Sequence, residues 1–196
     1  MIRFLDILFS SLGLIFLSPV FILLYIAISL ESSGGGFYRQ QRVGWHGKDF
    51  MLLKFRSMRI GSDKKGLITI GGRDPRITRI GYFIRKYKLD ELPQLFNVLL
   101  GDMSLIGPRP EVRKYVEMYT DEQYRVLTVR PGITDYASIE YADENEILGL
   151  ADNPDKVYVE RILPDKIGYN MKYIDNRSVF EYFRILFLTF KKVVIG

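Results

Sequence analysis

The chain has 196 residues, of which 47% are hydrophobic and 26% are charged, so it can bury one core and is not disordered. It contains no cysteine and one histidine, which excludes a disulfide framework, a thiolate metal site and a histidine-rich zinc site. The formal net charge of +5 favours an anionic partner, namely a nucleic acid, a membrane surface or a nucleotide.

The N-terminal part carries an uncharged apolar run from Ile7 to Leu30. As one straight helix it would be about 36 Å long, enough to cross the ~30 Å hydrocarbon core of a membrane. Pro19 lacks an N–H, and its ring crowds the carbonyl group four residues earlier, so we expect the helix to break at Ser18–Pro19. The Ser18 hydroxyl is expected to bond back to the carbonyl group of Leu14.

Basic residues flank this run on both sides, with Arg3 before it and Arg39, Arg42 and Lys48 after it. Because Lys and Arg are enriched at the cytoplasmic flanks of membrane segments, both ends are predicted to face the cytoplasm. Residues 1–36 are therefore predicted to form a re-entrant membrane helix and an elbow that enter one leaflet. A kinked helix that spans the membrane is the alternative.

A β-hairpin is predicted to follow from Phe37, with its turn at Trp45 to Lys48 and its second strand at Phe50 to Phe55. Lys54 and Arg56 lie near the end of this strand. One of them could reach a phosphate, and the alternative is that both are solvated strand charges. Residues 60–76 are rich in Gly, Lys and Asp and are expected to form a loop.

A basic amphipathic helix is predicted from Ile77 to Tyr87, because apolar residues recur at helical spacing and basic residues fill the other face. Its aromatic residues suit a membrane surface, although the same spacing is common in a plain core helix. Arg85 on this helix precedes Asp90 by five residues, close enough to face the same pocket.

The segment KLDELPQLFNVLLGDMSLIGPRPE, Lys88 to Glu111, carries the candidate chemistry. Asp90 and Glu91 are adjacent carboxylates at the predicted start of an apolar helix, with Asp90 as the N-cap and Pro93 in the first turn. Gly101 is expected to end this helix. Its buried face is predicted from four apolar residues at helical spacing: Leu92, Leu95, Phe96 and Leu99.

Arg109 stands between Pro108 and Pro110, which restrict its backbone so that its guanidinium group can be aimed. An acid pair, a helix start that attracts anions and a braced arginine together indicate phosphate chemistry with a metal ion. Ordinary helix capping and a rigid turn are the alternatives for these residues.

The remaining elements are predicted in chain order as a helix (Glu111–Thr128), a turn (Val129–Gly132), a strand or extended loop (Ile133–Tyr141), an acidic loop (Glu144–Asp155), a helix (Tyr158–Asp175, with Pro164 as a local start) and a last helix capped by Ser178. In the last helix Phe180, Phe183, Phe187, Phe190 and Val194 form one stripe beside lysines, which fits an interfacial helix. The fold class is therefore mixed α/β and mostly helical: a small globular domain with a short β-hairpin, interfacial amphipathic helices and an N-terminal re-entrant membrane helix.

Four motifs occur in one order: Ser18–Pro19 in the apolar run, KFRSM (Lys54–Met58), LDELPQLFNVLLGDMSLIGPRPE (Leu89–Glu111) and VRPGIT (Val129–Thr134). Together they resemble the bacterial sugar transferases, and within these the small monotopic phosphoglycosyl transferases, over nearly the whole chain. The resemblance implies transfer of a sugar-1-phosphate from a UDP-sugar to a membrane polyprenol phosphate with release of UMP. In bacteria this is the first membrane step of glycoconjugate assembly.

The resemblance also implies a ping-pong mechanism in which Asp90 is the nucleophile, forms a covalent aspartyl-phosphosugar intermediate and holds Mg²⁺ together with Glu91. The residues that it implies for substrate binding are Lys54, Arg85, Pro108, Arg109, Pro110, Arg130 and Thr134. It implies a protein of the bacterial inner membrane that enters one leaflet at the cytoplasmic face, with residues 37–196 as the cytoplasmic catalytic domain.

The sequence departs from the family pattern from Asp135 to Glu146, where an arginine of the family is missing, and Asn170 stands where many relatives carry an acidic residue. It does not identify the sugar, the polyprenol or the glycan pathway, and it leaves open whether a homodimer forms. One alternative is a non-enzymatic membrane adaptor whose acid pair only caps a helix. The other is a nucleic-acid binder, which is disfavoured because no recognition-helix motif or stacking platform is visible, so no nucleic-acid partner is predicted.

Overall fold

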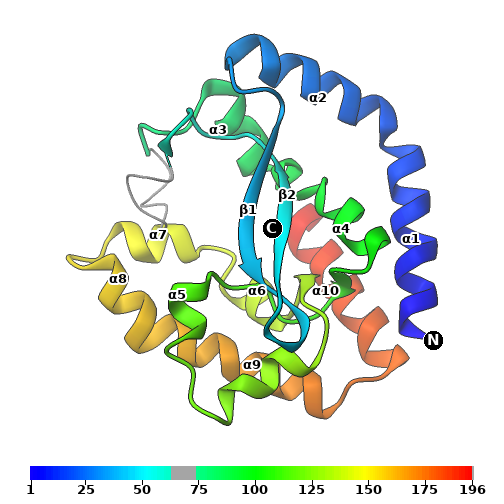
Figure 1. Cartoon of the computed structure of the whole chain (residues 1–196), viewed down its shortest axis with the longest axis vertical. Coiled ribbons are helices and arrows are strands. Elements are labelled where there is room, and N and C mark those ends of the chain that lie inside the picture. Colours follow the sequence, from blue (N-terminus) through cyan, green and yellow to red (C-terminus); the bar gives the residue numbers. More distant parts are fainter. Residues whose placement is uncertain (63–73, 196) are drawn as a thin grey trace.

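The computed structural model describes residues 1–62 and 74–195 of the chain. Its described part is mostly helical, with one antiparallel hairpin and one short parallel pair of strands (Figure 1). The predicted mixed, mostly helical fold with a short hairpin is confirmed. Most of the loop predicted at residues 60–76 lies outside the described residues.

The N-terminal run forms two helices, α1 (Ile2–Phe16) and α2 (Ser18–Glu31), which meet at an angle of 62°. The Ser18 hydroxyl donates to the carbonyl oxygen of Ile15 at 2.8 Å, so the predicted bond to Leu14 is wrong. In an unbroken helix that oxygen would accept the N–H of residue 19, and the hydroxyl replaces the bond that Pro19 cannot make. Among the described residues no single helix is long and apolar enough to cross a membrane, whereas this bent pair together is.

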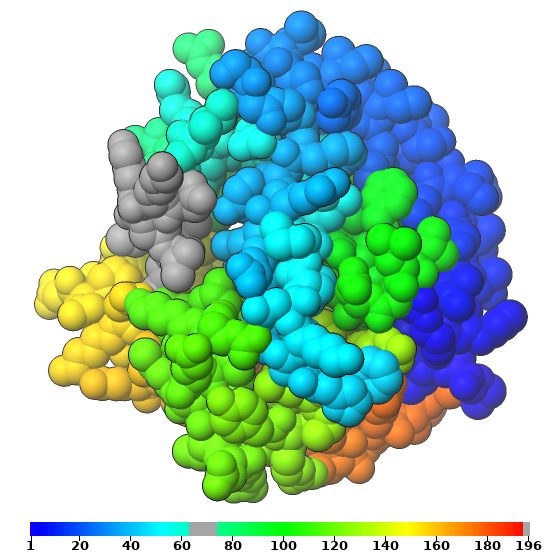
Figure 2. Space-filling view, in the orientation of Figure 1, coloured from blue at the N-terminus to red at the C-terminus, as the bar shows by residue number. Residues whose placement is uncertain are grey.

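The predicted hairpin is confirmed as β1 (Phe37–Val43) paired antiparallel with β2 (Asp49–Phe55) through a 3-10 turn at Trp45–Gly47. Figure 2 shows the hairpin lying across one face of the molecule, with α1 and α2 along one edge and α7 and α8 on the opposite edge. Arg56 follows β2 and donates to the carbonyl oxygens of Gly34 (2.7 Å) and Gly35 (3.0 Å). Arg56 therefore holds the elbow between α2 and β1.

The basic helix is confirmed as α3 (Arg79–Lys86), whose first turn is capped by the Thr78 hydroxyl. It leads through a 3-10 turn at Leu89–Glu91 into α4 (Gln94–Leu100), which ends at Gly101 as predicted, with a φ of 102° that favours glycine.

Helix α4 matches its predicted buried face only in part, since Leu92 and Leu95 do pack against core residues. Its buried residues are Gln94, Asn97 and Val98, whereas Phe96 is exposed and the three predicted leucines are half-buried. Asn97 is turned inward because its side-chain amide accepts from the N–H of Leu53 and donates to the carbonyl of Met51, both at 2.9 Å. These two bonds satisfy backbone groups on the edge of β2 that faces away from β1.

A parallel pair that periodicity did not predict is formed by β3 (Ser104–Ile106) and β4 (Gly132–Thr134). The segments that follow β3 and begin β4 cross closely here. A Cβ added at Gly132 would lie only 2.1 Å from the backbone nitrogen of Gly107. This contact needs glycine and places the Pro-Arg-Pro segment directly beside the VRPGIT motif.

Two charged residues near the start of α1 attach it to this centre. Asp6 is 1% exposed, and its Oδ1 accepts from Ser104 Oγ (2.9 Å), Leu105 N (3.0 Å) and Tyr182 OH (3.1 Å). Arg3 donates to two carbonyl groups in the last turn of α4. The broken helix is therefore joined to the core by buried polar contacts as well as by apolar packing.

The predicted helix over residues 111–128 is wrong, since the chain forms only α5 (Arg113–Val116) and a 3-10 helix (Gln123–Thr128). Thr120 and Gln123 exchange hydrogen bonds between each side chain and the other's backbone N–H, at 2.9 and 3.3 Å. Such a capping box starts a new helical segment and interrupts the previous one.

The predicted strand and acidic loop after residue 132 are also largely wrong. Only β4 is extended, and α6 (Tyr136–Glu140), α7 (Glu144–Gly149) and α8 (Pro154–Val157) follow it. Asp135 starts α6 by accepting the N–H of Ser138 at 2.6 Å, and Asn153 starts α8 in the same way.

The last two helices are confirmed as α9 (Leu163–Asp175), which follows a π-turn at Tyr158–Ile162, and α10 (Val179–Ile195) with Ser178 at its cap. The inward face of α10 carries Tyr182 and Ile185, while its phenylalanine stripe is exposed. The central core joins β2, α4, β3, α9 and α10 through Leu52, Val98, Met103, Leu105, Ile106, Tyr173, Tyr182 and Ile185.

Candidate active site

The acid pair lies in the 3-10 turn between α3 and α4. Lys88 enters this turn in the left-handed conformation, with a φ of 56°, and so redirects the chain at the end of α3. Pro93 occupies the N-cap position of α4, and no side chain of residues 1–62 or 74–195 caps that helix, so the prediction of Asp90 as the N-cap is wrong. The Asp90 carboxylate is thereby left available for another role.

Glu91 is paired with Arg109. Both Glu91 oxygens accept hydrogen bonds from the two terminal nitrogens of the guanidinium group, and Lys54 Nζ lies 4.0 Å from Oε1. Burial by itself would raise the pKa of Glu91, but Arg109 and Lys54 hold this pKa well below its usual range. The same contact raises the pKa of Arg109 above its ordinary value. Glu91 is therefore a permanently ionised group in a bidentate pair.

Asp90 is the opposite case. Asp90 is 7% exposed. Its carboxylate makes no hydrogen bond or ion pair with any other residue that the structure describes. Burial, with the negative charge of Glu91, raises the pKa of Asp90, while Lys54, Arg85 and Arg109 oppose this rise. The carboxylate oxygens of Asp90 are thus largely removed from water and have no partner among the described residues, while three cations stand nearby.

Lys54 lies near the end of β2, and burial strongly changes its pKa. Burial lowers the pKa of Lys54 from 10.5 to about 8, although the charge of Glu91 works against this change. A lysine in this state can change its charge near neutral pH.

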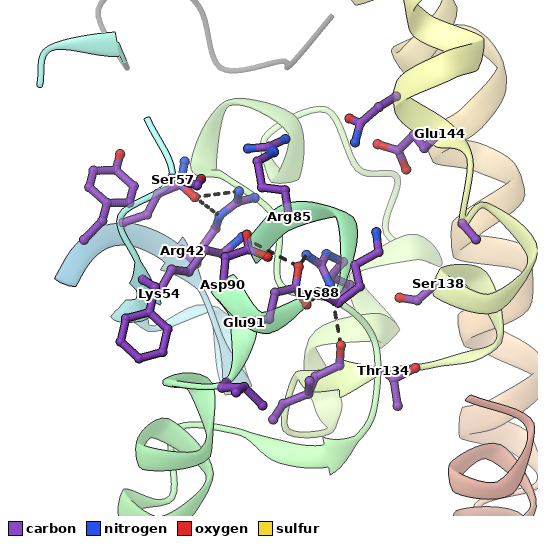
Figure 3. Close-up of a pocket in the computed structure, with 18 of the residues that line it drawn as sticks. Arg42, Lys54, Ser57, Arg85, Lys88, Asp90, Glu91, Thr134, Ser138 and Glu144 are labelled. Carbon is purple, nitrogen blue, oxygen red and sulfur yellow. Dashed lines mark hydrogen bonds and ion pairs between the residues drawn. The ribbon is translucent and has the colours of Figure 1, made fainter. Parts of the chain in front are cut away.

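These groups surround one cavity of about 550 Å³. Figure 3 shows Lys54, Asp90 and Glu91 on one side of it, with Arg85 and Lys88 beside them and Ser138 and Glu144 on the other side. Of the predicted site residues, the cavity is lined by Lys54, Arg85, Asp90, Glu91, Arg109 and Thr134. A volume of this size is typical of a small-molecule site.

Arg109 is aimed into the cavity by its neighbours. Its backbone N–H donates to the Asp135 carboxylate at 3.2 Å. The carbonyl of Pro108 accepts the N–H of Gly132 at 2.9 Å, and the carbonyl of Pro110 accepts from Arg42 at 3.2 Å. Neither proline lines the cavity in the described part of the chain, so both brace Arg109 from behind.

The structure does not bring Arg130 to the site. Its Nε donates to the carbonyl of Gly101 at 2.9 Å, and its guanidinium lies 4.1 Å from the Trp45 ring centroid. The prediction that Arg130 contacts substrate is therefore not supported by its position. Thr134 does line the cavity, where its hydroxyl shares a hydrogen bond of 2.9 Å with that of Thr189.

Several lining residues were missed by sequence reasoning, namely Arg42, Lys88, Ser138, Glu144, Asn145 and Lys166. Lys88 lies two residues before Asp90 in the sequence, and this proximity is a signal that could have found it. Arg42 and Lys166 are separated from Asp90 by dozens of residues, so only the folded chain brings them together.

The oxygen ligands at the site suit a magnesium ion that shares its coordination with a substrate. Within residues 1–62 and 74–195 no group of three or more His, Cys, Asp or Glu side chains could hold a metal ion. Mg²⁺ commonly uses one or two carboxylates and completes its shell with phosphate oxygens and water. In the described part of the chain the Asp90 oxygens have no partner, and Glu91 keeps lone pairs beside Arg109, so the acid pair fits this mode of binding.

The full chain, residues 1–196, matches the family model of the bacterial sugar transferases. A UDP-N-acetylgalactosamine–undecaprenyl-phosphate N-acetylgalactosaminephosphotransferase of Aeromonas hydrophila is 38% identical over 99% of this chain and 44% of its own length. A UDP-glucose:undecaprenyl-phosphate glucose-1-phosphate transferase of Escherichia coli is 37% identical over 94% of this chain and 38% of its own length.

The chain thus spans less than half the length of these two relatives. An uncharacterized sugar transferase of Bacillus subtilis is 39% identical over 95% of this chain, which covers 84% of that relative. Because the family model matches every residue, this chain belongs to the bacterial sugar transferase family.

Proposed function

We propose that this protein transfers a sugar-1-phosphate from a UDP-sugar to the phosphate of a membrane polyprenol and releases UMP. The observation that carries the proposal is the Asp90 carboxylate, which is buried, has no partner among the described residues and lines the same cavity as Lys54, Arg85 and Arg109. The relatives from Aeromonas hydrophila and Escherichia coli support it, since both are named as sugar-phosphate transferases that use undecaprenyl phosphate.

In the first step an Asp90 oxygen attacks the phosphorus that bears the sugar. The bond from this phosphorus to the UMP oxygen breaks, UMP leaves with the bonding electron pair, and an aspartyl-phosphosugar ester remains on the enzyme. Arg85, Arg109 and Lys54 offset the negative charge that otherwise opposes a carboxylate approaching a diphosphate.

In the second step an oxygen of the polyprenol phosphate attacks the same phosphorus. The bond to Asp90 breaks, which restores the carboxylate and yields a polyprenyl diphosphosugar. Since each displacement uses one substrate at a time, the two large substrates need not meet in the cavity, and the kinetics are ping-pong.

A magnesium ion fits the acid pair in this scheme. Asp90 and Glu91 would hold it together with the diphosphate of the substrate, and it would supply neutralisation of the diphosphate charge. Arg109 fixes Glu91 in the geometry described above, so that one carboxylate of the pair stays in place while the other reacts.

The polyprenol acceptor also accounts for the exposed apolar surface. Large hydrophobic side chains are exposed on α1, α2 and α10, among them Phe16 (77%), Leu23 (68%) and Phe187 (66%). We infer that these faces contact lipid, that the broken helix enters one leaflet from the cytoplasmic side, and that the protein resides in the bacterial inner membrane. The isoprenoid tail of the acceptor then stays in the bilayer while its phosphate reaches the cavity.

The test is UMP release from a panel of UDP-sugars with undecaprenyl phosphate and Mg²⁺. Asp90→Asn and Asp90→Ala are expected to abolish turnover, whereas Asp121→Asn, which changes an exposed carboxylate outside the cavity, is expected to keep it. Without acceptor, intact mass should show a phosphosugar adduct on the wild type and on Asp121→Asn. Turnover retained in both Asp90 variants would remove Asp90 from the nucleophilic role.

A further inference from the structure

The cavity has a second wall, formed by α6, α7 and α9, that the two displacement steps do not use. Figure 3 shows this wall across the cavity from the acid pair. Most of it belongs to the stretch Asp135 to Glu146. We call it the α6–α7 wall and define it by Ser138, Tyr141, Glu144, Asn145 and Lys166.

The charged groups of the α6–α7 wall are balanced. Lys166 Nζ lies 3.0 Å from a Glu144 oxygen and 3.8 Å from Glu111. Arg42 lies 3.7 Å from the other Glu111 oxygen, and the Tyr158 hydroxyl donates to Glu111. Within the wall as defined, Glu144 and Lys166 thus form a charge pair without net charge, which can offer charge-assisted hydrogen bonds.

Ser138 supplies an independent observation. Its Oγ is buried and has no hydrogen-bond partner among the described residues, although the residue lines the cavity. A buried hydroxyl without a partner is uncommon, because removing it from water costs free energy that a hydrogen bond normally offsets. A bound polar group on this side of the cavity would satisfy it.

We propose, on the basis of the function proposed above, that the α6–α7 wall binds the sugar of the UDP-sugar and selects an uncharged sugar, a hexose or N-acylhexosamine, over a hexuronate. Asp90 must reach the phosphorus that carries the sugar, so the sugar lies between that phosphorus and the wall facing Asp90. Its hydroxyl groups can donate to Glu144 and accept from Lys166 and Ser138. A hexuronate would set its carboxylate against Glu144, and Lys166, the cation beside Glu144, is already paired.

The test compares kcat/KM for uncharged UDP-sugars and UDP-glucuronate in the wild type, Glu144→Gln and Glu146→Gln. Glu146 is an exposed residue of the same helix that does not line the cavity, so it serves as the matched control. Glu144→Gln is expected to lower kcat/KM for the best uncharged substrate about tenfold. It is also expected to narrow the preference over UDP-glucuronate about tenfold, because Lys166 then loses a charged partner.

The affinity for UMP, measured by calorimetry, should stay within about twofold of wild type in Glu144→Gln, because UMP lacks the sugar. Ser138→Ala is a second variant, which tests the proposal even if Glu144→Gln does not fold. It should also lower kcat/KM for the uncharged substrate and leave UMP binding unchanged. An unchanged preference in a folded Glu144→Gln variant, or an unchanged kcat/KM for the uncharged substrate in Ser138→Ala, would overturn the inference. UMP binding weakened as much as UDP-sugar use would overturn it too, since the wall would then hold the nucleotide.

These outcomes are distinct from failure of the proposed function itself. If wild type binds UMP but releases none from any UDP-sugar, the proposed transferase activity fails and the sugar assignment falls with it. If wild type is active and only the selectivity results fail, the transferase activity stands and the assignment of the α6–α7 wall is wrong.

Discussion

Asp90 and Glu91 are adjacent in sequence, but their environments push their pKa values in opposite directions. Arg109 binds both oxygens of Glu91, whereas Asp90 is buried without a partner in the described structure. Two carboxylates with different environments can take different roles, one ionised and fixed and one reactive. The letters Asp-Glu do not reveal this difference, because it depends on where a guanidinium group 18 residues away is placed.

Lys54 gives a pH prediction. Burial lowers its pKa to about 8, so the ammonium form predominates below this pH and is lost as the pH rises through it. We expect kcat/KM for the UDP-sugar to fall above about pH 8 because a cation beside the diphosphate disappears. In Lys54→Arg the charge persists, so the decline should shift to higher pH. A pH profile of both proteins measures this, and identical alkaline limbs would mean that another group causes the decline.

Arg109 and Arg130 form a matched pair for a second test at this scale. Arg109→Lys removes the bidentate contact with Glu91 and should lower kcat/KM on the order of 100-fold, since hydrogen bonds between charged groups contribute roughly 1.5–3 kcal/mol each. Arg130→Lys should change kcat/KM by less than about threefold, because that side chain lies outside the cavity. Steady-state kinetics with one UDP-sugar measures kcat/KM of the two variants. Equal losses of kcat/KM in Arg109→Lys and Arg130→Lys would indicate that Arg130 is also a site residue.

At the scale of elements, the β3–β4 pair positions the site. Gly107 precedes the Pro-Arg-Pro segment, and its backbone touches that of Gly132 more closely than any Cβ would allow. We expect Gly132→Ala to lower the free energy of unfolding by about 2 kcal/mol or more. We also expect it to reduce activity, because displacing the Gly107 backbone moves Arg109, which follows two residues later.

Gly168→Ala is the control for this substitution. A Cβ there meets no atom within 4 Å, and the residue lies within α9, so alanine should leave stability unchanged or raise it by about 0.5–1 kcal/mol. Thermal unfolding in detergent measures both variants. Equal melting temperatures for Gly132→Ala and wild type would contradict the close contact.

The junction between α1 and the core gives another prediction at this scale. Asp6→Ala would leave the Ser104 hydroxyl, the Leu105 N–H and the Tyr182 hydroxyl without their common acceptor. The expected loss of stability is about 3 kcal/mol, since buried donors left unsatisfied each cost roughly 1–3 kcal/mol and some will recruit water. Denaturant unfolding followed by the fluorescence of Trp45, with Asp121→Ala as control, tests it. An unchanged midpoint would show that the three hydrogen bonds to Asp6 do not stabilise the fold.

For the whole molecule, the break at Ser18–Pro19 predicts topology. A re-entrant helix keeps both of its ends on the cytoplasmic side, whereas a spanning helix separates them. Because the chain has no cysteine, single cysteines can be introduced at Phe4 and Ser33, near the two ends of the bent pair.

In intact spheroplasts a membrane-impermeant maleimide should label neither cysteine, and lysis should expose both. An Asp121→Cys variant, on the globular body, is the control for the cytoplasmic side. Labelling of exactly one of the two positions before lysis would establish the spanning alternative instead.

The failed element predictions share one physical cause. Short side-chain caps, such as Thr120 with Gln123 and Asp135 with Ser138, divide the chain between residues 111 and 157 into brief helices. The spacing of apolar residues is judged over a long stretch of sequence, so it does not detect the short caps that end one helix and start the next. The buried face of α4 was partly misassigned for a related reason, because the polar Asn97 turns inward to bond β2.

The sequence by itself determined the broken N-terminal helix, the hairpin, the last two helices and the family, because proline geometry, strand alternation and contiguous motifs are local properties. It also determined that Asp90, Glu91, Lys54, Arg85 and Arg109 are the candidates at the site. Only the tertiary structure decided that Arg109 binds Glu91 rather than Asp90, that Arg130 lies outside the cavity, and that Glu144 and Lys166 line the cavity with the acid pair. These facts depend on contacts between residues distant in the chain, and such contacts are fixed by the packing of the whole molecule.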